Sequence, residues 1–231
     1  MKSLILASGF GTRLYPLTIT KAKALLEYKG KASISHIVDK IPQNIDILVN
    51  INKKFEADFR RWQNTVGRAV TLCVEPVFTE EQAFGAVGSL DYWIRTENIT
   101  DDLLVIASDN YFELDLSKFI AAYNGANTLV AVYDIDDKSK ASQYGVVQLD
   151  GCKIAGFEEK PAQPESSLIA VACYILPPRI FPLLFQFCAQ RKRDNLGDLI
   201  AYLAEKDEVH AYIFSELWFD IGSIEAYKSL Q

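Results

Sequence analysis

The stretch that decides the fold lies at the start of the chain, where residues 4–13 read LILASGFGTR. The apolar run Leu4–Ala7 is long enough for a short buried strand. It leads directly into a turn that contains Gly9 and Gly11, and glycine lets the backbone approach a ligand closely. Backbone N–H groups exposed in such a turn attract anions, so the stretch predicts a phosphate-binding loop after the first strand of an α/β fold.

Three known phosphate-binding patterns compete for this region. The dinucleotide pattern Gly-x-Gly-x-x-Gly requires glycine where the chain has Leu14, which makes that interpretation weak. The Walker-type pattern around residues 30–31 requires glycine and a hydroxyl where the chain has Leu25 and Ala32, so it fails as well. The motif that remains is Gly-x-Gly-Thr-Arg, which ends at Arg13.

Beyond this turn, apolar runs of strand length alternate with stretches of helical period, such as Phe55–Trp62 and Leu90–Ile94. The alternation predicts an α/β fold, a three-layer Rossmann-like arrangement of a mostly parallel sheet with helices on both faces. The predicted strands of the first half are Leu4–Ala7, Ile45–Val49, Ala69–Val74, Leu103–Ala107 and Leu129–Tyr133.

The second half has a different pattern, because its apolar runs lie closer together. This spacing predicts a small β-rich insertion in the α/β domain. The predicted elements there are strands at Val146–Leu149, Lys153–Phe157, Leu168–Leu176 and Val209–Phe214, and helices at Ile180–Gln190, Leu196–Lys206 and Ser223–Leu230. We find no proline-rich or serine-rich linker and no internal repeat, so a single domain over residues 1–231 is expected.

Composition excludes several classes of protein. With 231 residues, 49% of them hydrophobic, the chain can build a large core, which excludes disorder as its main state. The formal net charge of −6 argues against nucleic acid or an anionic membrane as a partner. The charge is uneven, since the first 31 residues carry six basic side chains and one acidic side chain. A local charge of +5 around the glycine-rich turn suits an anionic ligand.

The cysteines, the histidines and the hydropathy pattern argue against further classes of protein. The four cysteines are widely spaced, which indicates neither a disulfide framework nor a zinc site, and His36 and His210 stand in ordinary contexts. The first apolar run is too short for a signal peptide. The longest apolar stretch, nine residues at Leu168–Leu176, is about half of the ~18 residues that suggest a membrane span. We therefore expect a soluble cytoplasmic protein.

Two aspartates stand where ligands bind in open α/β sheets. Asp109 follows the apolar strand Leu103–Ala107, and Asp220 follows a predicted apolar and aromatic strand that contains Trp218 and Phe219. Two carboxylates without histidine or cysteine beside them suit a hard cation such as Mg2+ rather than zinc. The alternative is that each aspartate only caps the turn or helix that follows it.

These motifs occur in a characteristic order, which continues to the end of the chain. The later ones are GAVGSL at residues 85–90, VIASDN at 105–110, YGVV at 144–147, FEEKP at 157–161 and WFDIGS at 218–223. With the Gly-x-Gly-Thr-Arg turn and Lys23, the chain resembles the sugar-1-phosphate nucleotidylyltransferases of the nucleotidyltransferase family over residues 2–230. The resemblance implies a nucleotide-diphospho-sugar transferase-like fold, without a C-terminal β-helix domain, and one activity.

The resemblance also implies roles for individual residues. Arg13 and Lys23 are the implied catalytic residues, which hold the β- and γ-phosphates, and Mg2+ on Asp109 and Asp220 bridges the reacting phosphates. The implied nucleotide-binding positions are Ala7, Gly9, Gly11, Thr12, Gly85, Gly88 and Asp109. The implied sugar-phosphate-binding positions are Tyr144, Gly145, Glu159, Lys160 and Val171. The partners are then an NTP and a sugar 1-phosphate, with the oligomeric state left open, a homo-oligomer included.

Some positions depart from the family pattern. Ala86 removes a frequent threonine hydroxyl from the turn at residues 85–90, and residues 169–174 read IAVACY where the family often has Asn-Ala-Gly-x-Tyr. Glu81 and Gln82 either read the base edge or belong to a polar loop. The leading expectation is an NDP-sugar made from glucose 1-phosphate and UTP or dTTP. The alternatives are cytidylyl or guanylyl transfer to phosphocholine, a phosphonate or another sugar phosphate, and a non-catalytic nucleotide-sensing subunit.

Overall fold

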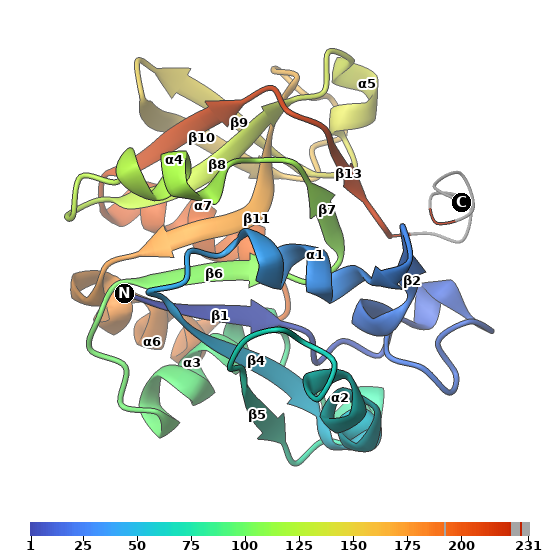
Figure 1. Ribbon diagram of the computed structural model, residues 1–231. Coiled ribbons are helices and arrows are strands. Elements are labelled where there is room, and N and C mark those ends of the chain that lie inside the picture. The colour runs from blue at the N-terminus through green and yellow to red at the C-terminus, as the bar shows by residue number, and fades with distance from the viewer. Residues whose placement is uncertain (192, 223–226, 228–231) are drawn as a thin grey trace. The chain divides into compact units, whose positions relative to one another are not determined.

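The computed structural model describes residues 1–191, 193–222 and 227 (Figure 1). The chain divides into two compact units. Unit 1 consists of Met1–Ala83, Ile106–Glu113 and Trp218–Gln231, and unit 2 consists of Phe84–Val105 and Leu114–Leu217. Unit 1 is thus assembled from three segments that are far apart in the sequence.

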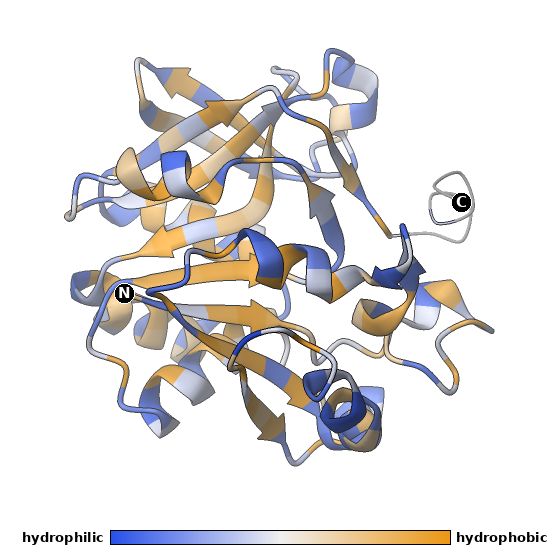
Figure 2. Ribbon diagram, in the orientation of Figure 1, coloured by the Kyte–Doolittle hydropathy of each residue, from blue (hydrophilic) through white to orange (hydrophobic). Residues whose placement is uncertain are grey.

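A parallel sheet forms the centre of unit 1. Strand β1 (Lys2–Leu6) pairs in parallel with β4 (Asp46–Asn52), and β4 pairs in parallel with β5 (Thr71–Glu75). These strands are mostly hydrophobic (Figure 2), as expected for parallel strands covered on both faces. Helix α2 (Glu56–Gln63) packs against β4 and β5 and buries Phe59 completely. Burial of one such side chain contributes about 1.5–3 kcal/mol.

Short elements complete unit 1. They are the 3-10 turns η1 (Thr12–Leu14), η2 (Lys23–Leu25), η3 (Lys53–Phe55) and η4 (Glu80–Gln82), the helix α1 (Ser33–Lys40), and the strands β2 (Glu27–Tyr28), β3 (Lys31–Ala32), β7 (Asn110–Phe112) and β13 (Trp218–Asp220). Strand β6 (Leu103–Ala107) begins in unit 2 and ends in unit 1, where the N–H of Ser108 donates to the carbonyl of Leu6 at 3.0 Å. The residues after β6 are therefore anchored beside the end of β1.

Unit 2 contains a mixed sheet in the order β11-β8-β12-β10-β9, in which β9 also pairs with β11. Its strands are β8 (Thr128–Asp134), β9 (Gly145–Asp150), β10 (Lys153–Glu159), β11 (Leu168–Leu176) and β12 (Val209–Phe214). Its helices are α3 (Ala86–Thr96), α4 (Leu116–Ala121), α5 (Lys138–Ala141), α6 (Phe181–Gln190) and α7 (Leu196–Lys206), with the 3-10 turn η5 (Pro178–Ile180) before α6. The longest described helices, α3 and α7, have 11 residues, and none of the described helices could cross a bilayer.

The predicted α/β class is confirmed, and each predicted strand and helix in the described residues corresponds to an observed element. The strand pairs β1–β4 and β4–β5 of unit 1 are parallel, whereas unit 2 combines the parallel pair β8–β12 with antiparallel pairs. Strands β9 and β10 must be antiparallel because only residues 151–152 join them. The predicted helix Ser223–Leu230 lies almost entirely outside the described residues.

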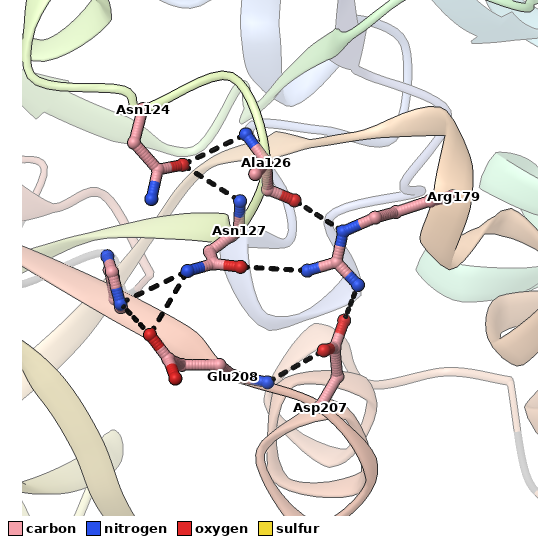
Figure 3. Close-up of polar contacts among 7 residues, drawn as sticks. Asn124, Ala126, Asn127, Arg179, Asp207 and Glu208 are labelled. Carbon is pink, nitrogen blue, oxygen red and sulfur yellow. Dashed lines mark hydrogen bonds and ion pairs between the residues drawn. The ribbon is translucent and has the colours of Figure 1, made fainter.

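A polar network fixes the loop before β8 in unit 2 (Figure 3). The side-chain oxygen of Asn124 accepts hydrogen bonds from the N–H groups of Ala126 and Asn127, both at 2.9 Å. The guanidinium of Arg179 donates to the carbonyl of Ala126 at 2.6 Å and to Asp207 at 2.5 Å. Because one planar side chain bonds both partners, it joins this loop to the end of α7.

Candidate active site

The two glycines of the glycine-rich turn have different structural roles. Gly11 has φ 65°, and a Cβ there would lie 3.2 Å from side-chain atoms of both Lys23 and Thr18. The hydroxyl of Thr18 also donates to the carbonyl of Gly11 at 2.6 Å. Gly9 is exposed, and a Cβ there would have no atom within 4 Å. Gly11 is therefore required by the turn, whereas Gly9 leaves its backbone open to a ligand.

Buried polar side chains from neighbouring strands hold the turn in place. Asn50 accepts a hydrogen bond from the N–H of Ala7 at 3.1 Å and donates to Glu75 at 2.5 Å. Asn52 donates to the carbonyl of Ser8 at 2.8 Å. Asn50 and Asn52 are 0% exposed and Glu75 is 1% exposed. Because hydrogen bonds at such depth are costly to break, this network fixes the backbone from which the turn departs.

An ion pair joins two predicted site residues of unit 1. The Nζ of Lys23 lies 3.2 Å from the Oδ2 of Asp109, and the two side chains are 13% and 37% exposed. The other oxygen of Asp109 accepts a hydrogen bond from the side chain of Asn110 at 3.1 Å. These bonds go to side chains rather than to the N–H groups of a following turn, so capping does not account for the orientation of Asp109.

Asp220 reaches the same region through a short antiparallel strand pair. Strands β7 and β13 place Asp220 opposite Asn110, and the N–H of Ile221 donates to the carbonyl of Asp109 at 2.8 Å. The indole N–H of Trp218 donates to the side-chain oxygen of Asn110 at 3.0 Å. The backbone segments that carry the two predicted carboxylates thus lie next to each other.

The donor set of this region fits magnesium better than zinc. The described residues contain no group of three or more histidine, cysteine, aspartate or glutamate side chains that could hold a metal. Asp109 and Asp220 supply only carboxylate oxygens, and Asp109 already binds a cationic group. Mg2+ commonly takes one or two carboxylates and leaves its other positions to water and substrate phosphates. Both residues therefore remain our proposed metal ligands.

The side chains next to the turn differ in their partners. Arg13 is exposed and forms no ion pair within the described residues, so its guanidinium is available to an anion. The hydroxyl of Thr12 donates to Glu80 at 3.1 Å. The side-chain oxygen of Gln82 accepts the N–H of Thr79 at 3.3 Å in a local capping box, and it also accepts the N–H of Phe78 at 2.9 Å. These bonds favour the polar-loop interpretation of Gln82 over base recognition.

In unit 2, Gly85 and Gly88 contact the segment before α7. Gly85 has φ 75°, and a Cβ there would lie 2.6 Å from the carbonyl oxygen of Arg193 and 2.5 Å from the side chain of Asp194. The N–H groups of Val87 and Gly88 donate to that same carbonyl at 2.8 and 3.2 Å. These N–H groups of α3 are therefore already bonded within the chain, and the nucleotide contact of this turn stays a prediction.

The predicted sugar-phosphate residues of unit 2 gather at the end of β10. Glu159 pairs directly with Gly145, and the N–H of Lys160 donates to the carbonyl of Tyr144 at 3.0 Å. Lys160 has φ 50°, and its Nζ lies 3.7 Å from the Oε1 of Glu159. The Lys160 side chain is 59% exposed, whereas that of Glu159 is 16% exposed. An exposed cation therefore stands beside a shielded carboxylate.

Val171 lies apart from these residues, in the core of unit 2. It is 2% exposed, and its neighbour Ala170 pairs with Gly145. Because successive side chains of a strand face opposite sides, Ala170 rather than Val171 shares a face with Gly145 and Glu159. The role of Val171 in sugar binding stays a prediction.

Comparison with known proteins identifies the family. The family model for nucleotidyl transferases matches residues 2–231. The chain belongs to the nucleotidyl transferase family. The predicted resemblance is thereby confirmed.

Two curated relatives show the extent of the match. The mannose-1-phosphate guanyltransferase of Candida albicans is 28% identical over 243 residues, which cover 99% of this chain and 63% of the relative. The bifunctional protein GlmU of Methanocaldococcus jannaschii is 29% identical over 239 residues, which cover all of this chain and 54% of the relative. The chain thus spans between about half and two thirds of the length of these nucleotidyl transferase relatives.

Solved structures share the fold. A Bacillus anthracis protein assigned as a glucose-1-phosphate thymidylyltransferase and solved with sucrose has a TM-score of 0.85 and 24% identity, covering 100% of this chain and 93% of that one. A UDP-glucose pyrophosphorylase without ligand has a TM-score of 0.79 and 19% identity, covering 100% of this chain and 96% of that one. The predicted nucleotide-diphospho-sugar transferase-like fold is confirmed.

Two of the four cysteines are poor candidates for nucleophilic chemistry. Cys73, Cys173 and Cys188 are buried, and Cys152 is exposed. Burial raises the pKa of Cys188 to about 11, and burial also raises the pKa of Cys173. Because the thiolate is the reactive form, neither of these two buried thiols is a ready nucleophile near neutral pH.

Sequence reasoning missed the polar supports of the nucleotidyl transferase turn. Asn50 and Asn52 end the apolar strand β4, and Glu75 ends β5. Polar side chains at the carboxyl ends of buried parallel strands are a signal for ligand sites, and the two asparagines could have been found by that rule. The same rule identified Asp109, since a loop carboxylate after an apolar strand is more conspicuous than an amide within one.

Proposed function

We propose that this chain is a sugar-1-phosphate nucleotidylyltransferase, which condenses an NTP with a sugar 1-phosphate to give an NDP-sugar and pyrophosphate. The observation that carries the proposal is the cluster in unit 1, where Lys23 lies against Gly11 of the glycine-rich turn and pairs with Asp109, whose carbonyl accepts the N–H of the residue after Asp220. Membership of the nucleotidyl transferase family over residues 2–231 supports it. The single catalytic domain expected from the sequence is part of the same proposal.

In this reaction an oxygen of the acceptor phosphate attacks the α-phosphorus of the NTP. The new P–O bond forms as the bond from the α-phosphorus to the bridging oxygen breaks, and pyrophosphate leaves with that electron pair. No covalent intermediate with the protein is needed, so the side chains act by positioning and by stabilising charge. Lys23 and Arg13 would bind the β- and γ-phosphates and stabilise the leaving group.

The remaining residues divide between the metal and the acceptor. Asp109 and Asp220 would hold Mg2+, which supplies positive charge to the phosphates when bound. Lys160 would bind the acceptor phosphate, because it is an exposed cation directly after β10. Glu159 would accept hydrogen bonds from acceptor hydroxyls, because its carboxylate has few partners within unit 2.

Activity assays with different combinations of NTP and acceptor identify the substrate pair. The purified protein is incubated with Mg2+, each common NTP and each of three acceptors: glucose 1-phosphate, mannose 1-phosphate and phosphocholine. We expect pyrophosphate release with a sugar 1-phosphate, and our preferred pair is glucose 1-phosphate with UTP or dTTP. The names of the curated relatives make mannose 1-phosphate with GTP the main competing pair. Turnover with phosphocholine alone would show that the acceptor is not a sugar 1-phosphate. No turnover with any pair would reject the proposed function.

Lys160→Ala is expected to raise the KM for the sugar phosphate about 10- to 100-fold, since a hydrogen bond to a charged group contributes about 1.5–3 kcal/mol. The KM for the NTP should change little. Alanine and lysine both carry a Cβ, so the left-handed backbone at position 160 is equally strained in both proteins. Steady-state kinetics test the ranking, with Lys118→Ala, an exposed lysine on α4, as the control. A larger rise in the KM for the NTP than in the KM for the sugar phosphate would contradict the assignment of Lys160 to the acceptor phosphate.

A further inference from the structure

Gly197, the second residue of helix α7, packs directly against Glu159 of β10. A Cβ at position 197 would lie 1.9 Å from the Oε2 of Glu159 and 2.8 Å from its Cδ. The backbone of Gly197 is not in the left-handed region, so any residue could adopt its conformation. Glycine also lowers helix stability relative to alanine. The absence of a side chain at this position is therefore explained by the space that the Glu159 carboxylate occupies.

A second glycine bounds the same carboxylate from the sheet. Gly145 pairs with Glu159 across β9 and β10. A Cβ at position 145 would lie 3.0 Å from the Oε2 of Glu159 and 2.4 Å from the Cζ of Phe157. The side chains of Phe157 and Glu159 thus lie in a slot that two glycines leave open, one on strand β9 and one on helix α7.

The slot fixes which oxygen of Glu159 faces which neighbour. Oε2 lies toward the two glycines, and Oε1 lies 3.7 Å from the Nζ of Lys160. Within the described part of the chain, the Glu159 carboxylate makes its polar contact with the Lys160 ammonium group. A shielded carboxylate with spare acceptor capacity is costly to bury unless a donor completes its hydrogen bonds. Hydroxyl groups of an acceptor are donors of this kind.

We propose that Gly197 is a positioning residue, which holds the Glu159 carboxylate where it binds the hydroxyl groups of a polyhydroxylated phosphate acceptor. The inference rests on the proposed function and deepens it, since it names the feature that selects the acceptor class. A side chain at position 197 forces the carboxylate to turn away by more than an ångström. A displacement of that size costs up to about 100-fold in rate when a substrate group must be aligned.

The test is a double-mutant cycle of Gly197→Ala and Glu159→Ala, measured as kcat/KM for the sugar 1-phosphate. We expect Gly197→Ala to lower this value about 10- to 100-fold and to leave the KM for the NTP within about twofold. In the Glu159→Ala background, the added methyl has no carboxylate to displace, so Gly197→Ala should have no further effect. Gly67→Ala is the matched control, because a Cβ there meets no atom within 4 Å.

The outcomes separate a positioning role from a purely structural one. Gly197→Ala could instead lower kcat/KM equally in both backgrounds and also change the KM for the NTP and the melting temperature. This result would mean that the glycine only allows helix packing, and it would overturn the proposal. Unchanged acceptor kinetics would overturn it too. No turnover by the unmodified protein would instead reject the proposed function itself.

A second variant keeps the test decisive if Gly197→Ala does not fold. Glu159→Asp shortens the side chain by one methylene and moves the same carboxylate out of the slot. We expect it to give a selective rise in the KM for the sugar 1-phosphate, with the KM for the NTP unchanged. Normal acceptor kinetics in Glu159→Asp would show that the position of this carboxylate does not matter and would overturn the inference.

Discussion

Asp109→Asn and Asp220→Asn are each expected to lower kcat by about 10²- to 10⁴-fold, with loss of the normal dependence on Mg2+. A bound metal contributes several kcal/mol of charge stabilisation in the transition state, and each 1.36 kcal/mol corresponds to a factor of ten in rate. Asparagine keeps the shape of the side chain and removes its negative charge. The hydrogen bond from Ile221 to the carbonyl of Asp109 involves the backbone, so the strand pair should survive both changes.

The measurement is pyrophosphate release as a function of Mg2+ concentration, together with direct binding of Mn2+ to the protein followed by electron paramagnetic resonance. The control is Asp39→Asn, which removes an exposed carboxylate of unit 1 that pairs with Lys31. The control should keep both activity and metal affinity. Near-normal turnover in both Asp109→Asn and Asp220→Asn would contradict the metal assignment, and normal Mn2+ binding in both would do so independently.

Gly85→Ala is expected to be the most destabilising of the small substitutions discussed. Gly85 has φ 75° and ψ 162°, a conformation essentially restricted to glycine that costs other residues about 1–3 kcal/mol, and the new Cβ would also lie 2.6 Å from the carbonyl oxygen of Arg193. That oxygen accepts hydrogen bonds from Val87 and Gly88 at the start of α3, so it cannot move without breaking them. Overpacking and lost hydrogen bonds add at least about 2 kcal/mol.

Gly125→Ala provides the matched control for this prediction. Gly125 has φ 77°, close to the 75° of Gly85, but a Cβ there meets no atom within 4 Å. It therefore measures the cost of a positive φ without a steric contact. Thermal unfolding should show a melting temperature for Gly85→Ala that lies roughly 4–8 °C below that of Gly125→Ala, at about 2–4 °C per kcal/mol for a chain of this size. Equal losses in the two variants would show that the contact with Arg193 is not tight.

Most of the fold could be predicted from the sequence because its strands and helices have clear periodicity. The bounds of α7 and β12 agree with the predicted ranges Leu196–Lys206 and Val209–Phe214. The aromatic strand expected before Asp220 corresponds to β13, whereas β7 was not predicted, because three residues are too few to show a period. The pairing of these two strands depends on contacts such as the bond from Trp218 to Asn110, which joins residues 108 positions apart.

The candidate site was predictable where chemistry is carried by residue type. Asp109 and Lys23 were identified from motifs, and the structure joins them in an ion pair. Gly197 was not identified, because its importance depends on the space around it rather than on any property of its own side chain. Asn50 was missed although it stands near the carboxyl end of an apolar strand, because an amide within a strand is less conspicuous than a carboxylate in the loop after it.

Because unit 1 is assembled from three separate segments, its parts are synthesised at different times. Asn110 leaves the ribosome 108 residues before Trp218, its partner across β7 and β13, which amounts to about 5–22 s at ordinary rates of translation. During that interval Asp109 lacks the strand that brings Asp220, whereas Lys23 has already been made. The nascent chain can therefore neutralise Asp109 with its own lysine before the second carboxylate arrives, and the proposed metal site is complete only once Asp220 has been made.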